Sequence, residues 1–297
     1  MAHPPACSTP SPRSLPAQPS PAQTLPARTL LAVFAHPDDE AFGNGGTLAR
    51  YAAAGFAVHL ICATRGGSGK ITDPDIPADS DRGVLREAEL REACRALGVR
   101  EPIFLDFHDS GRFERLRRDD PKALVNVDDL DLERALLPHL VRLRPTVMLT
   151  FDPHGIYGHI DHLKMHRAAT AAFWSVGNLC ERPPRRLFYS VMLREAMAAM
   201  QELRPASPLS DLEPELYGVS EASLAARLDV SAYAEPKRAA IRAHRSQVGP
   251  ASSFANVDAQ SDAAWAQMMR EESFTLGGLR GSFPAPPLDD LFAGLEP

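Results

Sequence analysis

Cysteine and long apolar runs are both scarce in this chain of 297 residues. The four cysteines stand far apart and form no C-x-x-C pair, so we expect neither a disulfide framework nor a thiolate metal site. No apolar run approaches the roughly 20 residues that a membrane-spanning helix needs, and we expect no membrane partner. Basic runs are also absent and the net charge is −6, so we expect no nucleic-acid partner. The sequence leaves homo-oligomerisation open.

The two ends of the chain differ in composition from its middle. Residues 1–28 are rich in Pro, Ala and Ser, and prolines interrupt every stretch that could serve as the apolar part of a secretion signal. We therefore predict a disordered extension over 1–28 and a cytoplasmic protein. Residues 284–297 look similarly loose, although Leu288 to Leu295 could dock against the body. A single domain is then predicted over residues 29–283.

Apolar runs alternate with amphipathic stretches through this central part. Strands buried on both faces are predicted for the runs at 29–35, 56–63, 102–107, 145–151 and 187–192. Helices are predicted at 45–54, 82–97, 132–143 and 159–174. The alternation predicts an α/β fold, a Rossmann-like and mostly parallel sheet flanked by helices. The less regular stretch at 195–231 is predicted to be a lid or an insertion.

Polar loops rich in His, Asp, Arg and Gly follow the first four strands. They lie at 36–44, 64–70, 108–113 and 152–162. In sheets of this kind ligands bind outside the carboxyl ends of the strands, so these loops are predicted to form the functional site.

Two of these loops carry residue types that bind catalytic metals. One reads His36-Pro37-Asp38-Asp39-Glu40, and the other runs from Asp152 to His162. Two histidines and a carboxylate from separate loops are a common catalytic zinc arrangement. Residue chemistry alone does not choose among the candidate ligands, which are His36, Asp38, Asp39, His154, His159, His162 and His166.

The same motifs resemble those of a known family. The run Ala35 to Glu40 directly after the first strand is similar to the signature of the LmbE/PIG-L N-deacetylases, which hydrolyse N-acetylglucosamine conjugates with a bound metal. Weaker matches follow in the same order at Asp109-Ser110-Gly111, at Tyr157 to His162 and at His244 to Gln247. One departure is Ile160, where the family usually has proline. The resemblance implies an LmbE-like fold and the removal of acetyl from an amino-sugar conjugate, with release of acetate.

Carried over to this sequence, the resemblance assigns a role to each of ten residues. It implies that His36, Asp39 and His162 bind the metal, which we expect to be Zn²⁺, with Fe²⁺ or Co²⁺ as alternatives. Asp38 would be the general base, and His159 would stabilise the oxyanion or protonate the leaving amine. Asp161 would orient the His159 ring, and Tyr157 would polarise the scissile carbonyl. Arg65 or Arg82, together with Asp109, would hold sugar hydroxyls.

Two other functions are weighed against this one. A related branch of the family cleaves amides such as thiol S-conjugates and typically carries a lysine shortly after the signature. Phe42-Gly43-Asn44-Gly45 offers none at that place. A non-catalytic sugar- or metal-binding module is the second alternative, and it has no need for Asp38 beside the metal.

Overall fold

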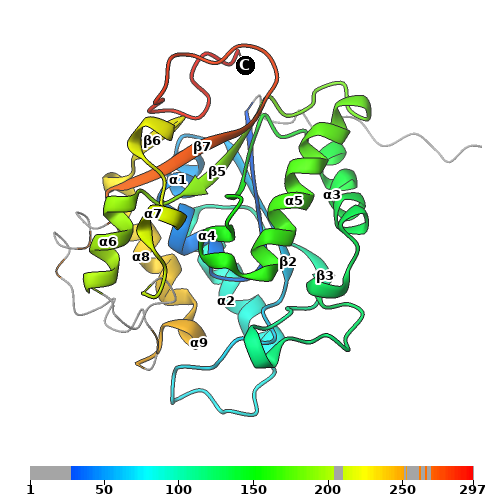
Figure 1. Cartoon of the computed structure of the whole chain (residues 1–297), viewed down its shortest axis with the longest axis vertical. Coiled ribbons are helices and arrows are strands. Elements are labelled where there is room, and N and C mark those ends of the chain that lie inside the picture. The colour runs from blue at the N-terminus through cyan, green and yellow to red at the C-terminus, as the bar shows by residue number, and fades with distance from the viewer. Residues whose placement is uncertain are drawn as a thin grey trace, which may run out of the picture.

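A mixed sheet of seven strands forms the centre of the computed structural model, which describes residues 28–203, 210–250, 252, 261, 265 and 269–296 (Figure 1). The strand order is β3-β2-β1-β4-β5-β7-β6. The parallel strands are β1 (Thr29–Phe34), β2 (Ala57–Thr64), β3 (Ile103–Phe107), β4 (Val147–Phe151) and β5 (Arg186–Val191). The antiparallel strands are β7 (Glu271–Leu279) and β6 (Ala226–Asp229). The predicted α/β fold with a mostly parallel sheet is confirmed.

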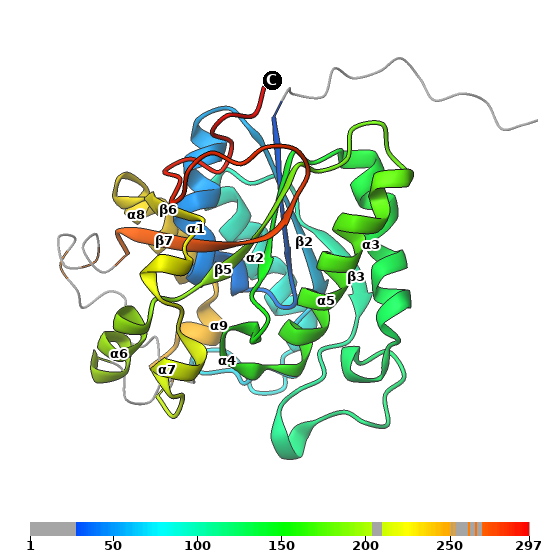
Figure 2. The ribbon, with the colours of Figure 1, turned by 45° about the horizontal axis from the view of Figure 1, so that its top comes forward.

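Helices cover both faces of the sheet (Figures 1 and 2). One layer contains α1 (Asp39–Ala53), α2 (Arg82–Leu97) and α8 (Ala234–Ala243), which pack on one another. The other layer contains α3 (Asp129–Leu143) and α5 (Ile160–Ser175). Every residue of β1 is buried, as expected for a strand enclosed between two helical layers. Shorter helices are α4 (Gly155–Gly158), α6 (Arg194–Leu203), α7 (Pro214–Tyr217) and α9 (Arg245–Val248).

Helix α1 begins six residues before the predicted start at Gly45. The prediction gave weight to Gly43, Gly45 and Gly46, each of which costs a helix about 1 kcal/mol relative to alanine. In the structure these glycines allow close packing: a Cβ at Gly46 would lie 2.5 Å from Cγ2 of Val230. Tertiary packing therefore outweighs the helix propensity of the segment.

The C-terminal segment is docked on the body at the end of the sheet opposite α4 and α9 (Figures 1 and 2). Leu291 and Phe292 are buried, and the Tyr51 hydroxyl donates to Asp290 Oδ1 at 2.7 Å. Arg186 donates to the carbonyl oxygen of Leu291. A loose tail is thus the wrong expectation for Leu288 to Leu295, and the docking alternative is correct. The extension predicted over 1–28 lies outside the described residues, except for Arg28.

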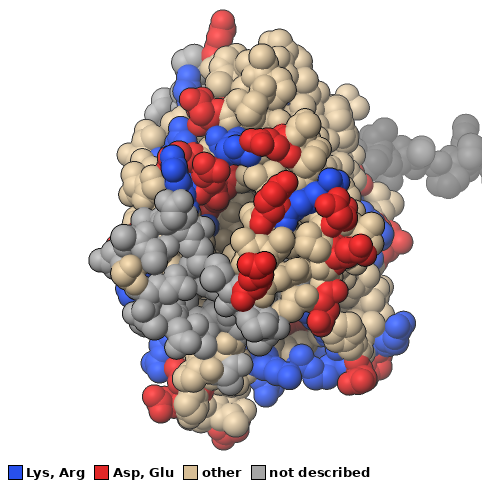
Figure 3. Space-filling model, turned by 60° about the vertical axis from the view of Figure 1, so that its left-hand side comes forward, with Lys and Arg blue, Asp and Glu red and all other residues tan. Residues whose placement is uncertain are grey.

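The stretch at 195–231 contains most of α6, then α7 and β6, while residues 204–209 lie outside the described part. β6 pairs with β7 at one edge of the sheet, and neither strand was predicted. Acidic and basic side chains are intermixed over much of the described surface of one face (Figure 3). Among the described residues, no helix has both the length and the apolar composition required to cross a membrane.

Candidate active site

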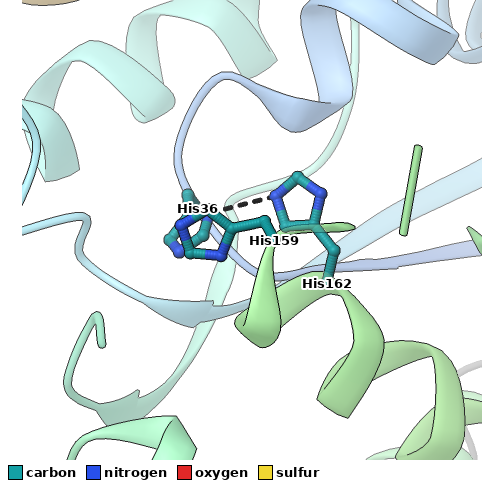
Figure 4. A group of neighbouring side chains, drawn as sticks. All are labelled: His36, His159 and His162. Carbon is teal, nitrogen blue, oxygen red and sulfur yellow. Dashed lines mark hydrogen bonds between the residues drawn. The ribbon is translucent and has the colours of Figure 1, made fainter. Parts of the chain in front are cut away.

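The candidate site lies where the strand order reverses, between β1 and β4. His36 and Asp39 follow β1, and the loop from Asp152 to His162 follows β4. Because β1 and β4 are neighbouring parallel strands, their carboxyl ends deliver both segments to one place. Figure 4 shows the rings of His36, His159 and His162 gathered there.

The hydrogen bonds of two histidines fix which ring nitrogen is free. His36 Nε2 lies 3.0 Å from Asp161 Oδ2 and donates to it, so Nδ1 is the nitrogen left to bind a metal. His162 Nδ1 lies 3.1 Å from the carbonyl oxygen of Gly155, so here Nε2 keeps the lone pair. The His162 ring also stacks on Phe151 at a centroid distance of 4.0 Å. Each ring is therefore held in the orientation that a metal ligand requires.

The two free nitrogens converge with the carboxylate of Asp39. His36 Nδ1 and His162 Nε2 are 3.3 Å apart (Figure 4). Asp39 Oδ1 lies 3.3 Å from His162 Nε2, and Asp39 Oδ2 lies 3.6 Å from His36 Nδ1. Ligands bound tetrahedrally at about 2.0–2.1 Å are separated by about 3.3–3.4 Å, so these three groups fit a zinc-sized divalent ion.

The electrostatic environment of this centre also favours a cation. Burial lowers the pKa of His36, but the carboxylates of Asp109, Asp161 and Asp39 raise it to about 9. Burial raises the pKa of Asp39, but His162 and His36 outweigh it and hold that pKa below its usual range. The carboxylates thus create a negative potential that a divalent cation would neutralise.

His159 is close to the other two histidines but has a different hydrogen-bond pattern. Proximity alone places His36, His159 and His162 in one possible metal-binding group. However, His159 Nδ1 accepts a hydrogen bond of 3.1 Å from the backbone N–H of Asp161, so Nε2 carries the proton of the neutral ring. Burial lowers the pKa of His159 and keeps the ring neutral. His159 is therefore better suited to donate a hydrogen bond than to bind the metal.

Asp38 is held beside this centre in an unusual backbone conformation. Its φ is 116°, in a region that side-chain-bearing residues rarely adopt at a cost of about 1–3 kcal/mol. Arg86 donates to Asp38 Oδ2 at 2.9 Å and also to the carbonyl oxygen of Pro37. Burial raises the pKa of Asp38 to about 6, against the opposing effect of Arg86. The carboxylate is therefore partly buried, with a raised pKa that suits a base.

The backbone of Asp38 has a second support. Its N–H donates to Glu40 Oε2 at 3.0 Å, and Glu40 Oε1 lies 2.7 Å from His244 Nε2. Glu40 and His244 are almost fully buried. This buried pair connects the end of β1 to the residue that follows α8.

Asp38, Asp39 and His162 line a cavity of about 400 Å³. This volume lies within the range of about 300–1,000 Å³ that is usual for small-molecule sites. Tyr157 is on its wall, with its ring 5.0 Å from that of His162 and the guanidinium of Arg112 4.9 Å from the Tyr157 ring centroid. The cavity therefore brings together a candidate metal centre, the partly buried carboxylate of Asp38 and a phenol.

Comparison with known proteins identifies the family. Residues 31–173 match the model of the family described as PIG-L, GlcNAc-PI de-N-acetylase. A relative from Rhodococcus jostii, named 1D-myo-inositol 2-acetamido-2-deoxy-α-D-glucopyranoside deacetylase, is 35% identical over 289 residues, which cover 90% of this chain and 98% of that protein. This chain belongs to the PIG-L family. The predicted function, hydrolysis of the acetyl group of an N-acetylated amino sugar, is thereby confirmed at the level of the family.

Solved structures agree with the fold expected of a PIG-L protein. A conserved protein of Thermus thermophilus aligns with a TM-score of 0.52 and 26% identity, covering 90% of this chain and 98% of its own. The N,N'-diacetylchitobiose deacetylase of Pyrococcus horikoshii aligns with a TM-score of 0.51 and 19% identity, covering 84% and 83%. The second likeness concerns the fold alone.

Three residues predicted to bind substrate lie away from the lining of this PIG-L cavity. Arg65, Arg82 and Asp109 line a second hollow of about 610 Å³, beside β3 and the start of α2. Asp109 accepts the backbone N–H groups of Ser68 and Gly111, and its Oδ1 lies 3.6 Å from His36 Nε2. The structure thus places Asp109 behind the metal centre and does not bring Arg65 or Arg82 to it.

The predicted contact of Asp161 with His159 is made by the Asp161 backbone, while the carboxylate contacts other groups. Its Oδ2 accepts hydrogen bonds from His36 Nε2 and from the backbone N–H of Ser110. The contact with His159 comes from the Asp161 backbone, because Asp161 is in the first turn of α5 and His159 is the residue that caps it. Asp161 therefore orients a candidate metal ligand.

The other two histidines that the sequence offered as candidate ligands lie outside the candidate metal centre. His154 is half exposed beside Asp152, and His166 Nδ1 contacts the carbonyl oxygen of Phe151. The structure adds two positioning groups to those assigned from the sequence, Arg86 and the Glu40–His244 pair. Glu40 belongs to the signature run and His244 to a weaker match, but their contact with each other and the reach of Arg86 to Asp38 depend on segments far apart in the chain.

Proposed function

We propose that this PIG-L protein removes the acetyl group from an N-acetylglucosamine conjugate, and that His36, Asp39 and His162 hold its catalytic metal. The observation that carries the proposal is the convergence of His36 Nδ1, His162 Nε2 and the Asp39 carboxylate beside the partly buried carboxylate of Asp38. We further propose Zn²⁺ as the ion, with Fe²⁺ or Co²⁺ able to occupy the same donor set. A divalent ion at this place would supply Lewis acidity to the acetamide and a lowered pKa to water.

The side chains around the centre divide the remaining chemistry. Asp38 takes a proton from water as the water attacks the acetamide carbon. His159, with its proton on Nε2, donates to the oxygen on which negative charge develops. Tyr157, whose ring lies 6.1 Å from that of His159 and which lines the cavity, donates to the same oxygen. Asp38 then carries the proton that the leaving nitrogen needs. Acetate and a free amine are the products.

The relatives suggest the identity of the conjugate. The Rhodococcus jostii protein is named for a 2-acetamido-2-deoxyglucose linked to myo-inositol, and this chain covers 98% of its length. We propose the same neutral conjugate as the first substrate to test. The cytoplasmic location stays a prediction from the sequence, and homo-oligomerisation stays open.

The proposal is tested by acetate release from a panel of N-acetylglucosamine conjugates. The panel contains myo-inositol, malate and simple alkyl aglycones, and each reaction is run with metal-loaded wild type and with Asp38→Asn. Release by wild type and its near absence from a metal-replete Asp38→Asn protein are expected. Failure of the wild type on every conjugate, with one metal bound per chain, would overturn the assignment in favour of another amide or a binding role.

A further inference from the structure

The wall of the cavity on the side of β5 is mostly apolar. Four of its described residues are Phe42, Phe151, Met192 and Met269. Two small polar side chains interrupt it, Asn44 from α1 and Ser190 from the end of β5. Neither was assigned a role by the metal chemistry described above. Together they form a polar patch in an otherwise apolar wall.

Asn44 has an unsatisfied polar atom at this place. The residue is 1% exposed, and its Oδ1 is buried without a hydrogen-bond partner in the described part of the chain. A buried polar atom left unpaired costs about 1–3 kcal/mol, and folded proteins rarely leave one so. Because Asn44 lines a cavity, the missing partner can come from a bound molecule.

Ser190 approaches α1 at the residue before Asn44. A Cβ at Gly43 would lie 3.4 Å from Ser190 Oγ, so α1 and the end of β5 lie close together here. Ser190 is 5% exposed and lines the same cavity as Asn44. Both polar side chains therefore belong to one region of the lining.

The charges of the lining indicate the chemistry of the bound group. Asp38 and Asp39 are the acidic residues of the described lining, and none of the described lining residues is Lys or Arg. A carboxylate or phosphate on the aglycone would meet no lysine or arginine among the described lining residues. A hydroxyl group both donates and accepts, so it matches a carboxamide beside a serine hydroxyl.

We propose that Asn44 and Ser190 form a subsite that binds a hydroxyl group of the conjugate and favours an uncharged, polyhydroxylated aglycone. The inference rests on the proposed function for the identity of the substrate, but the binding it describes is measurable without turnover. The proposal gives Asn44, which lies one turn after Glu40 on α1, a role in substrate specificity. Removal of the polar group should weaken binding and leave the chemical step in place.

The test compares Asn44→Leu with a matched control on the same helix, Thr47→Val. Leucine has nearly the shape of asparagine but makes no hydrogen bond. Thr47 is also fully buried with its Oγ1 unpartnered, yet it is not among the described lining residues. Both substitutions delete an orphan polar atom, so both should leave the melting temperature unchanged or raise it. The comparison then depends on whether the deleted polar group lines the cavity, as it does at Asn44 and not at Thr47.

For the myo-inositol conjugate, Asn44→Leu should raise KM about 3- to 10-fold with kcat within twofold, as expected for loss of one hydrogen bond. Thr47→Val should leave KM unchanged. Asn44→Leu should also reduce the preference for the myo-inositol over the malate conjugate. A fall in melting temperature for Asn44→Leu, or a KM equal to that of wild type, would overturn the subsite and assign Asn44 a structural role or a bound water only.

Calorimetric binding of the deacetylated myo-inositol conjugate separates this inference from the proposed reaction. Binding to wild type that weakens in Asn44→Leu supports the subsite even if no acetate is released from any conjugate. Equal binding by both proteins, or no binding to wild type, overturns it even if hydrolysis is observed.

Discussion

Two hollows open at the carboxyl end of the sheet, and they are built from very different surroundings. In the metal cavity the charged groups are buried and joined: the side chains of His36, Asp39 and His162 are at most 10% exposed. In the hollow beside β3, the Arg65 side chain is 36% exposed and its partner Asp106 is 70% exposed. Exposed ion pairs contribute about 0–1 kcal/mol, whereas buried charges strongly shift each other's pKa. The degree of burial therefore distinguishes the reactive cluster in the metal cavity from the exposed charged residues beside β3.

The topology of the sheet explains the difference. β1 and β4 lie in the middle of the sheet, so the loops that follow them are covered by α1, α5 and the segment after α8. β3 is an edge strand, and Asp106 near its end and Arg82 at the start of α2 are exposed. A substitution at the switch point should therefore have a much larger effect than one beside β3, and the following predictions test this from the largest effect to the smallest.

Asp38→Asn removes the proposed base while keeping the size of the side chain. General base catalysis contributes about 10²–10⁴-fold, so kcat should fall by that factor in a deacetylation assay. Metal content, measured by elemental analysis of the same sample, should remain at the wild-type level. A parallel loss of metal and activity would instead make Asp38 a ligand.

Asp161→Asn weakens the carboxylate that orients His36. Groups that hold a ligating histidine typically contribute 10–100-fold to metal affinity, so competition with a chelator should show a loss of about that size. Activity should recover when metal is added in excess. If metal affinity is unchanged while activity falls, Asp161 acts on the chemistry itself and the contact with His36 is incidental.

His244→Gln tests the buried pair that supports the strained Asp38 backbone. Glutamine is smaller than histidine and holds Glu40 less firmly, so kcat should fall about tenfold, which corresponds to about 1.4 kcal/mol. KM and metal affinity should stay near their wild-type values. Equal losses in stability and in all kinetic constants would indicate a general packing defect.

Arg82→Ala and Arg65→Ala test the hollow beside β3. Because these side chains are exposed and outside the described lining of the metal cavity, kcat/KM should change less than twofold and stability by less than about 1 kcal/mol. Kinetics on the myo-inositol conjugate will show this directly. A tenfold rise in KM would extend the substrate site into the second hollow and remove the contrast between them.

The sequence predicted the fold where local pattern and tertiary packing agree. Helix α2 has the predicted bounds, Arg82–Leu97, because its apolar spacing and the glycine at 98 both act locally. The start of α1 was missed because glycine lowers helix propensity, whereas packing against Val230 requires it. β6 and β7 were missed because each depends on pairing across a long separation in the chain.

The candidate site divides in the same way. The residues that converge follow two strand ends, and a motif adjoining each strand made them visible in the sequence. His159 accepts a hydrogen bond at Nδ1, whereas His162 donates one from Nδ1. These bonds depend on the first turn of α5 and on the carbonyl oxygen of Gly155, which no spacing rule specifies. Likewise, the sequence does not show that Arg65 lies beside an edge strand while Arg86, on the next helix, reaches Asp38.

The contact between Glu40 and His244 has a consequence for the order in which the enzyme matures. The two residues are 204 positions apart along the chain. All three proposed metal ligands precede position 163, so a nascent chain folding from its N-terminus contains a complete donor set well before His244 has been made. The residues proposed to hold the metal are thus made before the group that supports the Asp38 backbone, and that support requires α8 to fold against α1.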